Sequence, residues 1–203
     1  DDVTDPATPV LANVTGECSA TATAPTTTDN CAGTITGPTT DPLSYTDQGM
    51  YTITWTFDDG NENIIMVDQM VIVDDVTDPA TAALADVTGE CDATVTAPTT
   101  TDNCAGTITG TTNDPLTYDA QGTYTISWTF DDGNDNVIMV DQTVIVEDVS
   151  APVLNCPSDI EVNNSPGTCS KPVDFEVTAT DNCGFSSTGP QPIAGFSGPF
   201  TFG

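Results

Sequence analysis

Hydrophobic and polar residues alternate with a period of two in the most regular parts of the chain. Tyr51, Ile53, Trp55 and Phe57 are separated by single threonines, and Tyr124, Ile126, Trp128 and Phe130 are separated by threonine or serine. Successive side chains of a β-strand point to opposite faces, so this pattern predicts strands with one apolar face and one threonine-rich face. We expect both tryptophans, which lie on the apolar face, to be buried.

Shorter alternations occur around residues 93–97 and 108, and a β-branched run occupies residues 137–146. Proline and glycine clusters separate these segments, and no segment has the periodicity of an amphipathic helix. Several short antiparallel strands are therefore expected. The predicted fold class is all-β, with tandem immunoglobulin-like β-sandwich domains in an elongated array.

One long segment of the chain occurs twice in succession. Residues 1–73 and 74–146 differ at 15 positions, and the opening phrase Asp-Asp-Val-Thr-Asp-Pro returns in altered form from Glu147. Such periodicity is typical of arrays of similar units. We predict one domain of six or seven strands at 1–73, a second at 74–146, and a partial third at 147–203, with an atypical C-terminal segment from Gly184. The linkers would have almost no length.

The charge balance narrows the possible functions. The chain has 31 acidic residues, a single basic residue at Lys171 and no histidine, which gives a formal net charge of −30. A chain of this sign is repelled by phosphate backbones and anionic lipids, so we expect neither nucleic-acid binding nor membrane insertion. The usual general acid–base and charge-stabilising groups are also missing, so no enzyme activity is expected.

Seven cysteines occur without histidine and without a Cys-x-x-Cys motif, which argues against a zinc site. If each repeat folds independently, its two cysteines pair with each other, as Cys18–Cys31 and Cys91–Cys104. Cys169–Cys183 follows by position, and Cys156 remains unpaired. Disulfides would imply an oxidising, extracellular compartment, and free buried thiols are the alternative.

Acidic and amide residues gather in three loops of each predicted sandwich that should meet at one end. Like charges placed together repel one another, and a hard cation with six to eight oxygen ligands would convert that repulsion into binding. The predicted cofactor is calcium. Its candidate ligands are Asp1, Asp2, Asp5, Asp29, Asn30, Asp58, Asp59, Asn61, Glu62, Asp74, Asp75, Asp78, Asp102, Asn103, Asp131, Asp132, Asn134, Asp135, Glu147, Asp148, Asp181 and Asn182.

A plainer interpretation of the same loops is turn chemistry. Asp-Asp-Gly-Asn is a common hairpin turn and Asp-Asn-Cys is typical of a capped loop. The spacing in residues 57–63 does not satisfy an EF-hand loop, so the sequence leaves both interpretations open.

Three phrases of the repeats are distinctive. They are Asp-Asn-Cys-Ala-Gly-Thr-Ile-Thr-Gly, Gly-Thr-Tyr-Thr-Ile-Ser-Trp-Thr-Phe-Asp-Asp-Gly-Asn and Gln-Thr-Val-Ile-Val-Glu-Asp. These phrases resemble the tandem repeats of giant surface adhesins of gliding bacteria. The third unit, with Cys156-Pro157, Gly167-Thr168-Cys169 and Asp181-Asn182-Cys183, is similar to a HYR module, an immunoglobulin-like domain of adhesion proteins. That family has a further cysteine on its final strand, which would be the partner of Cys156.

The resemblance implies a long filament on the bacterial cell surface, exported by the type IX secretion system and used in gliding. We therefore expect a structural stalk whose partners are neighbouring repeats, while other regions would contact an external surface or polysaccharide. Two alternatives are an extracellular carbohydrate-binding module and an accessory domain of a secreted enzyme.

Overall fold

The computed structural model describes residues 2–155, 158–161, 167 and 178–184. These residues form strands and loops, without a helix, so the all-β prediction is confirmed for them. Accordingly, no helix that could span a membrane occurs in the described part of the chain. Two compact units are present: unit 1 comprises Asp1–Leu84, Ala97–Asn113 and Ser127–Asp141, and unit 2 comprises Ala85–Thr96, Asp114–Ile126 and Gln142–Gly203.

The described part of the first repeat contains seven strands, as the sequence suggested, and all of them belong to unit 1. They are β1 (Val14–Gly16), β2 (Ala20–Thr21), β3 (Thr26–Asp29), β4 (Gly33–Thr36), β5 (Ser44–Tyr45), β6 (Gly49–Asp58) and β7 (Ile64–Val73). The sheets have the orders β1-β7-β6, β2-β5 and β3-β4.

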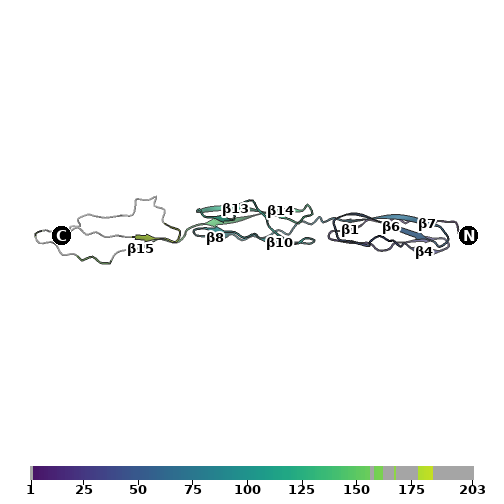
Figure 1. Cartoon of the computed structure of the whole chain (residues 1–203), viewed down its shortest axis with the longest axis horizontal. Helices are drawn as coiled ribbons and strands as arrows, with labels where there is room; N and C mark the ends of the chain where they lie inside the picture. The colour runs from purple at the N-terminus through teal and green to yellow at the C-terminus, as the bar shows by residue number, and fades with distance from the viewer. Residues whose placement is uncertain (1, 156–157, 162–166, 168–177, 185–203) are drawn as a thin grey trace. The chain divides into compact units, whose positions relative to one another are not determined.

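The longest ladder of the first repeat pairs β6 with β7 along their whole length, from Gly49 opposite Val73 to Asp58 opposite Ile64. The two strands lie side by side in Figure 1. Ile53, Trp55 and Phe57 of β6 are almost completely buried, as the alternation predicted. They pack with Ala20, Ala22, Ile35, Val71 and Val73 into one apolar core. Side chains from several small sheets therefore share the core, as in a sandwich-type fold.

One pairing differs from the prediction of antiparallel strands. β1 pairs with β7 in parallel, with Val14 opposite Val71 and Gly16 opposite Val73. The Nε2 of Gln69 on β7 donates to the Ala12 carbonyl ahead of β1 at 2.8 Å, which ties the segment before β1 to the same strand. This pairing places the turn after β1 beside the C-terminal end of β7.

The second repeat has the corresponding strands. They are β8 (Val87–Gly89), β9 (Ala93–Thr94), β10 (Thr99–Asp102), β11 (Gly106–Thr109), β12 (Thr117–Tyr118), β13 (Gly122–Asp131) and β14 (Val137–Val146). Trp128 is about 1% exposed, so the prediction of buried tryptophans is confirmed in both repeats. β14 pairs with β8 in parallel, as β7 does with β1.

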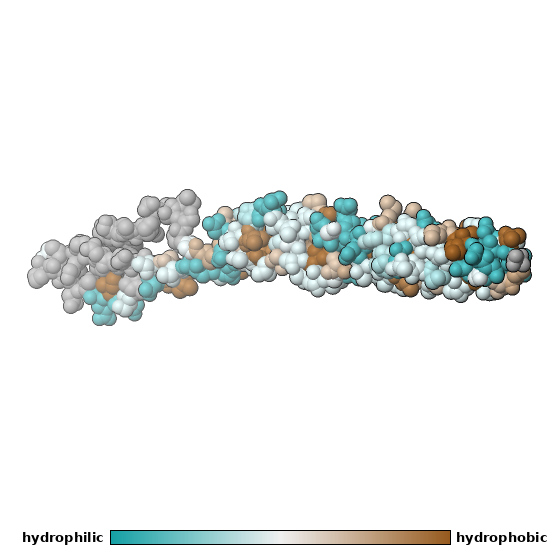
Figure 2. Space-filling model, turned by 45° about the vertical axis from the view of Figure 1, so that its right-hand side comes forward, coloured by the Kyte–Doolittle hydropathy of each residue, from teal (hydrophilic) through white to brown (hydrophobic). Residues whose placement is uncertain are grey.

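Little of the third repeat is described. β15 (Val153–Asn155) pairs antiparallel with β16 (Thr178–Thr180). The surface of the described residues is mostly polar, with separate apolar patches in the view of Figure 2. Residues such as Met50 and Met66 are exposed and contribute to the apolar part of this surface.

Candidate functional site

Two disulfides join successive repeats. Cys18 of the first repeat pairs with Cys104 of the second, with a Cα–Cα distance of 5.0 Å and a sequence separation of 86. Cys91 of the second repeat pairs with Cys183 of the third, with a Cα–Cα distance of 4.8 Å and a separation of 92. The first disulfide lies within unit 1 and the second within unit 2.

The predicted pairings within repeats, Cys18–Cys31, Cys91–Cys104 and Cys169–Cys183, are therefore wrong. The physical reason lies in the length of the β6–β7 ladder. Gly16 is opposite Val73 at one end of the ladder, whereas the Asp29–Cys31 turn lies beside Asp59 in the hairpin at the other end. A ladder of this length spans about 30 Å. A disulfide requires Cα atoms about 4.4–6.8 Å apart, so Cys18 cannot reach Cys31.

The remaining cysteines are Cys31, Cys156 and Cys169. Cys31 is exposed and free. Cys156 and Cys169 lie outside the described residues, so their predicted states stay predictions. The two disulfides fit a secreted or extracellular protein, because such bonds persist in oxidising compartments.

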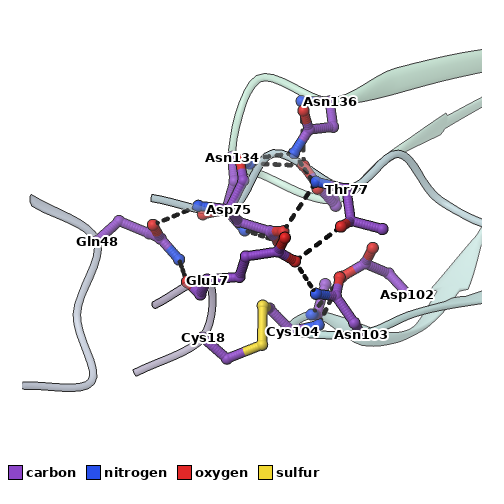
Figure 3. Close-up of a disulfide and its surroundings, with 12 residues drawn as sticks. Glu17, Cys18, Gln48, Asp75, Thr77, Asp102, Asn103, Cys104, Asn134 and Asn136 are labelled. Carbon is purple, nitrogen blue, oxygen red and sulfur yellow. Dashed lines mark hydrogen bonds between the residues drawn. A yellow bond between two sulfur atoms is a disulfide. The ribbon is translucent and has the colours of Figure 1, made fainter. Parts of the chain in front are cut away.

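A set of polar contacts surrounds the Cys18–Cys104 disulfide (Figure 3). The Oε2 of Glu17 accepts hydrogen bonds from the Thr77 hydroxyl at 2.7 Å and from the Asn103 amide. Gln48 donates to the Glu17 carbonyl at 2.8 Å and accepts from the Asp75 backbone N–H at 2.9 Å. Glu17 and Gln48 of the first repeat are thus hydrogen-bonded to each other beside the disulfide, and each also hydrogen-bonds to the second repeat.

The Cys91–Cys183 disulfide has the same surroundings in unit 2. Glu90 Oε2 accepts from the Ser150 hydroxyl at 2.8 Å and from the Asn182 amide. Gln121 donates to the Glu90 carbonyl at 2.7 Å and accepts from the Asp148 N–H at 2.7 Å. One junction geometry therefore occurs twice, built from corresponding residues.

Two groups of three carboxylates are formed by the acidic loops. Asp2, Asp29 and Asp59 form one group, and Asp75, Asp102 and Asp132 form the other; within each group one oxygen of each residue lies within 4.8 Å of the others. The prediction that the three acidic loops meet is confirmed for both repeats. Asp75 is only 3% exposed, which makes its group the more enclosed of the two.

The turns use one carboxylate oxygen of Asp2, Asp29 and Asp102 and leave the other without a hydrogen bond. Asp102 Oδ1 accepts from the N–H groups of Cys104 and Ala105, both at 2.8 Å. Asp29 Oδ1 does the same for Cys31 and Ala32. The Oδ2 atoms of Asp2, Asp29 and Asp102 are buried and have no hydrogen-bond partner. The loops are therefore capped turns, as the plainer interpretation held, and they also have oxygens free for another ligand.

Hydrogen bonding keeps two of these carboxylates ionised. The backbone N–H groups of Ala32 and Cys31 lower the pKa of Asp29. The side-chain amide of Asn63 is the main cause of the lowered pKa of Asp59. Donors that stabilise the charged form make protonation less favourable. Asp29 and Asp59 consequently bring two negative charges to this group at neutral pH.

The other predicted ligands do not join these two groups, and Asp1 lies outside the described residues. Asp58 and Asp131 each cap the hairpin turn through the N–H of Gly60 or Gly133, at 2.8 Å. Asn103 and Asn182 belong to the junction contacts, Asn30 bonds Thr4, and Asp148 and Asp181 bond nearby backbone N–H groups. Asn61 and Asn134 hydrogen-bond to group members. Asp5, Glu62, Asp74, Asp78, Asp135 and Glu147 are exposed and outside both groups.

The sequence predictions omitted the junction residues Glu17, Gln48, Glu90 and Gln121. The signal that could have found them is the phrase Gly-Glu-Cys, which recurs at 16–18 and 89–91. A Cβ on Gly16 would lie 1.9 Å from the Ser19 carbonyl oxygen, so the tight turn excludes any larger residue there. This turn presents Glu17 and Cys18 together.

No protein-family model matches the chain, and no curated protein is detectably similar to it.

The disulfide connectivity predicts opposite outcomes for two cysteine substitutions. Cys104→Ser opens a loop of 86 residues and should lower the free energy of unfolding by about 4 to 5 kcal/mol in the chain-entropy treatment. Cys31→Ser removes an exposed, unpaired thiol and should change it by less than about 0.5 kcal/mol. Urea unfolding of the oxidised chains measures both. Equal destabilisation by the two substitutions would support pairing within repeats instead.

The carboxylates also govern the reactivity of Cys31. The Asp2 carboxylate is the main cause of the raised pKa of the Cys31 thiol, and the charge of Asp29 adds to it. Asp2→Asn should therefore shift the onset of thiolate formation to lower pH. The measurement is the rate of iodoacetamide labelling of the Cys31 peptide against pH in chelator, with Asp5→Asn as the control. Identical profiles for Asp2→Asn and the unsubstituted chain would contradict the assignment.

Proposed function

We propose that the chain is part of the structural stalk of a secreted bacterial cell-surface adhesin or filament, composed of immunoglobulin-like repeats. The observation that carries the proposal is the stagger of the two disulfides, each joining one repeat to the next. The resemblance of the repeat phrases to giant gliding adhesins points the same way, and it adds gliding motility and type IX secretion to the proposal.

Staggered disulfides change the path that a pulling force takes. From Cys18 the covalent path crosses to Cys104, runs back along the chain to Cys91 and crosses to Cys183. It uses only the short backbone segment 91–104, whereas without the disulfides the path would follow the whole chain from residue 18 to residue 183. Most of each repeat lies outside this shortest path, so unfolding cannot lengthen the chain much while the disulfides are intact. Resistance to extension is the property that a stalk requires.

The structure offers less to a carbohydrate-binding module. Sugar recognition commonly uses exposed aromatic faces, and both Trp55 and Trp128 are buried in the apolar core positions of their strands. A hollow of about 290 Å³ next to the Cys18–Cys104 disulfide is lined by Cys18, Thr46, Asp47, Gln48, Cys104, Ala105 and Asn134. Its lining contains no aromatic residue, and its acidic residue would not stack on a sugar ring.

Calcium is the second part of the proposal. Oxygen atoms that bind one calcium ion at about 2.4 Å lie at most about 4.8 Å apart. The carboxylates of Asp75, Asp102 and Asp132 meet that limit, and so do those of Asp2, Asp29 and Asp59. The buried, unpartnered Oδ2 atoms of Asp29 and Asp102 supply the donors that a hard cation needs. A bound ion would neutralise each group and fix the loops that form it.

The mechanical proposal is tested by stretching single molecules held at their two ends. Reducing the disulfides should lengthen the fully extended chain by about 150 residues, or about 500 Å. Pairing within repeats, as Cys18–Cys31, Cys91–Cys104 and Cys169–Cys183, would release only about 40 residues, or about 130 Å, and that result would contradict the proposal. Cys31→Ser serves as the control, since it should leave the released length unchanged.

The calcium proposal is tested by titration calorimetry and thermal unfolding. The chain should bind two calcium ions at the two described groups, and Asp102→Asn, which keeps Oδ1 for the turn, should remove one of them. At one hundred times Kd, each bound calcium ion should add about 2.7 kcal/mol to the free energy of unfolding, because binding favours the folded state. Magnesium is the control for nonspecific screening of the negative charge. Asp78→Asn, at an exposed aspartate outside both groups, is the control for Asp102→Asn and should leave calcium binding unchanged. Equal unfolding in calcium, magnesium and chelator would contradict the proposal.

A further inference from the structure

We propose that the surface formed by Asp2, Thr4, Asn30 and Cys31 is a docking surface for another β-unit that presents a Gly-Glu-Cys turn. In this interaction the partner's glutamate is bound by Thr4 and Asn30, and its cysteine forms a disulfide with Cys31. We call these four residues the Cys31 face.

The second repeat shows this interaction already formed. Thr77, Asn103 and Cys104 occupy the positions in the second repeat that Thr4, Asn30 and Cys31 occupy in the first. Thr77 and Asn103 both donate to Glu17, and Cys104 is bonded to Cys18. Asp75, at the position of Asp2, donates its backbone N–H to Gln48. All four counterparts thus contact one partner repeat.

Unit 2 supplies an independent second case. Ser150, Asn182 and Cys183 of the third repeat engage Glu90 and Cys91 in the same manner. Ser150 supplies the hydroxyl that Thr77 supplies in the first junction, and the sequence around Asn182 and Cys183 is less similar to the first two repeats than these are to each other. The contact set is therefore maintained where the sequence around it has changed, which indicates that these groups act together on a Glu-Cys partner.

In the first repeat the same groups are in place without such a partner among the described residues. Asn30 Nδ2, whose counterpart reaches Glu17, lies 3.5 Å from the Thr4 hydroxyl. Cys31 has a free thiol and is exposed. The Asp29 carboxylate accepts a hydrogen bond from the Cys31 backbone N–H at 2.8 Å, as Asp102 does from the backbone N–H of Cys104. The turns that present the two cysteines are therefore capped in the same way. The Cys31 face needs little rearrangement before binding.

The chemistry selects a narrow class of partner. Glutamate supplies a carboxylate to the amide and the hydroxyl, and the adjacent cysteine supplies the sulfur. Bond formation proceeds by exchange with a small disulfide such as oxidised glutathione. One thiolate attacks it and releases reduced glutathione, and the second thiolate then displaces the other glutathione from the mixed disulfide.

The test extends the chain at its start with a further copy of residues 1–73, joined to Asp1 as Val73 is joined to Asp74. In the added copy, Cys31→Ser removes the competing thiol and Ser19→Asp, which gives the residue of the second repeat, marks its peptide. Cys156→Ser and Cys169→Ser simplify the thiols of the parent chain. After refolding in glutathione buffer, non-reducing digestion and mass spectrometry should show the added Cys18 linked to Cys31.

Two substitutions test whether the disulfide depends on binding of the partner's glutamate or only on the closeness of the two cysteines. Asn30→Ala should lower the ratio of linked to glutathione-capped Cys31 by about tenfold, because a hydrogen bond to a carboxylate is lost. Asn13→Ala, at an exposed position outside the Cys31 face, should leave that ratio unchanged. The proposal is overturned if the added Cys18 stays capped while Cys18–Cys104 forms in the same molecule, or if Asn30→Ala has no effect. If Cys18–Cys104 also fails to form, the junction assignment on which the proposal rests is wrong too.

Discussion

The register of β6 and β7 in unit 1 is the constraint on which the junction depends. The long ladder places the Gly16–Cys18 turn at one end and the Asp29–Cys31 turn at the other. A cysteine at each end cannot close a bond within the repeat, so Cys18 pairs with Cys104 of the next repeat and Cys31 is left free. The parallel pairing of β1 with β7 then fixes Cys18 beside Asp74, whose N–H donates to the Gly16 carbonyl at 3.0 Å. Covalent linkage between repeats follows from strand length.

The same arrangement explains why so much negative charge is tolerated. Asp29 and Asp102 accept hydrogen bonds from backbone N–H groups within their own turns, and in Asp29 these bonds lower the pKa of the carboxyl group. The oxygens that remain lie close to those of the neighbouring carboxylates. Disulfide and carboxylate group occupy neighbouring positions, since Asp102 caps the turn that presents Cys104. In the proposed stalk, cross-link and cation site would stiffen the same short segment.

Much of the fold was predictable from the sequence, because alternation records burial directly. Trp55 and Trp128 are buried as expected, and the acidic loops meet as expected. The disulfides were not predictable from spacing. Cys18 and Cys31 are close along the chain, yet an extended ladder separates them, and only the register shows it. Glu17 was missed because its role is a contact with the next repeat, which leaves no periodic trace in its own segment. The parallel pairing of β1 has no local signature either.

The central claim is that successive repeats are linked covalently, and non-reducing peptide mapping of the oxidised chain tests it most directly. Digestion without reductant followed by mass spectrometry should yield one linked pair containing Cys18 and Cys104 and another containing Cys91 and Cys183, with Cys31 outside both. Linked pairs containing Cys18 with Cys31 and Cys91 with Cys104 would contradict the claim. They would also contradict the proposed covalent path from Cys18 to Cys183 and the proposed docking at the Cys31 face.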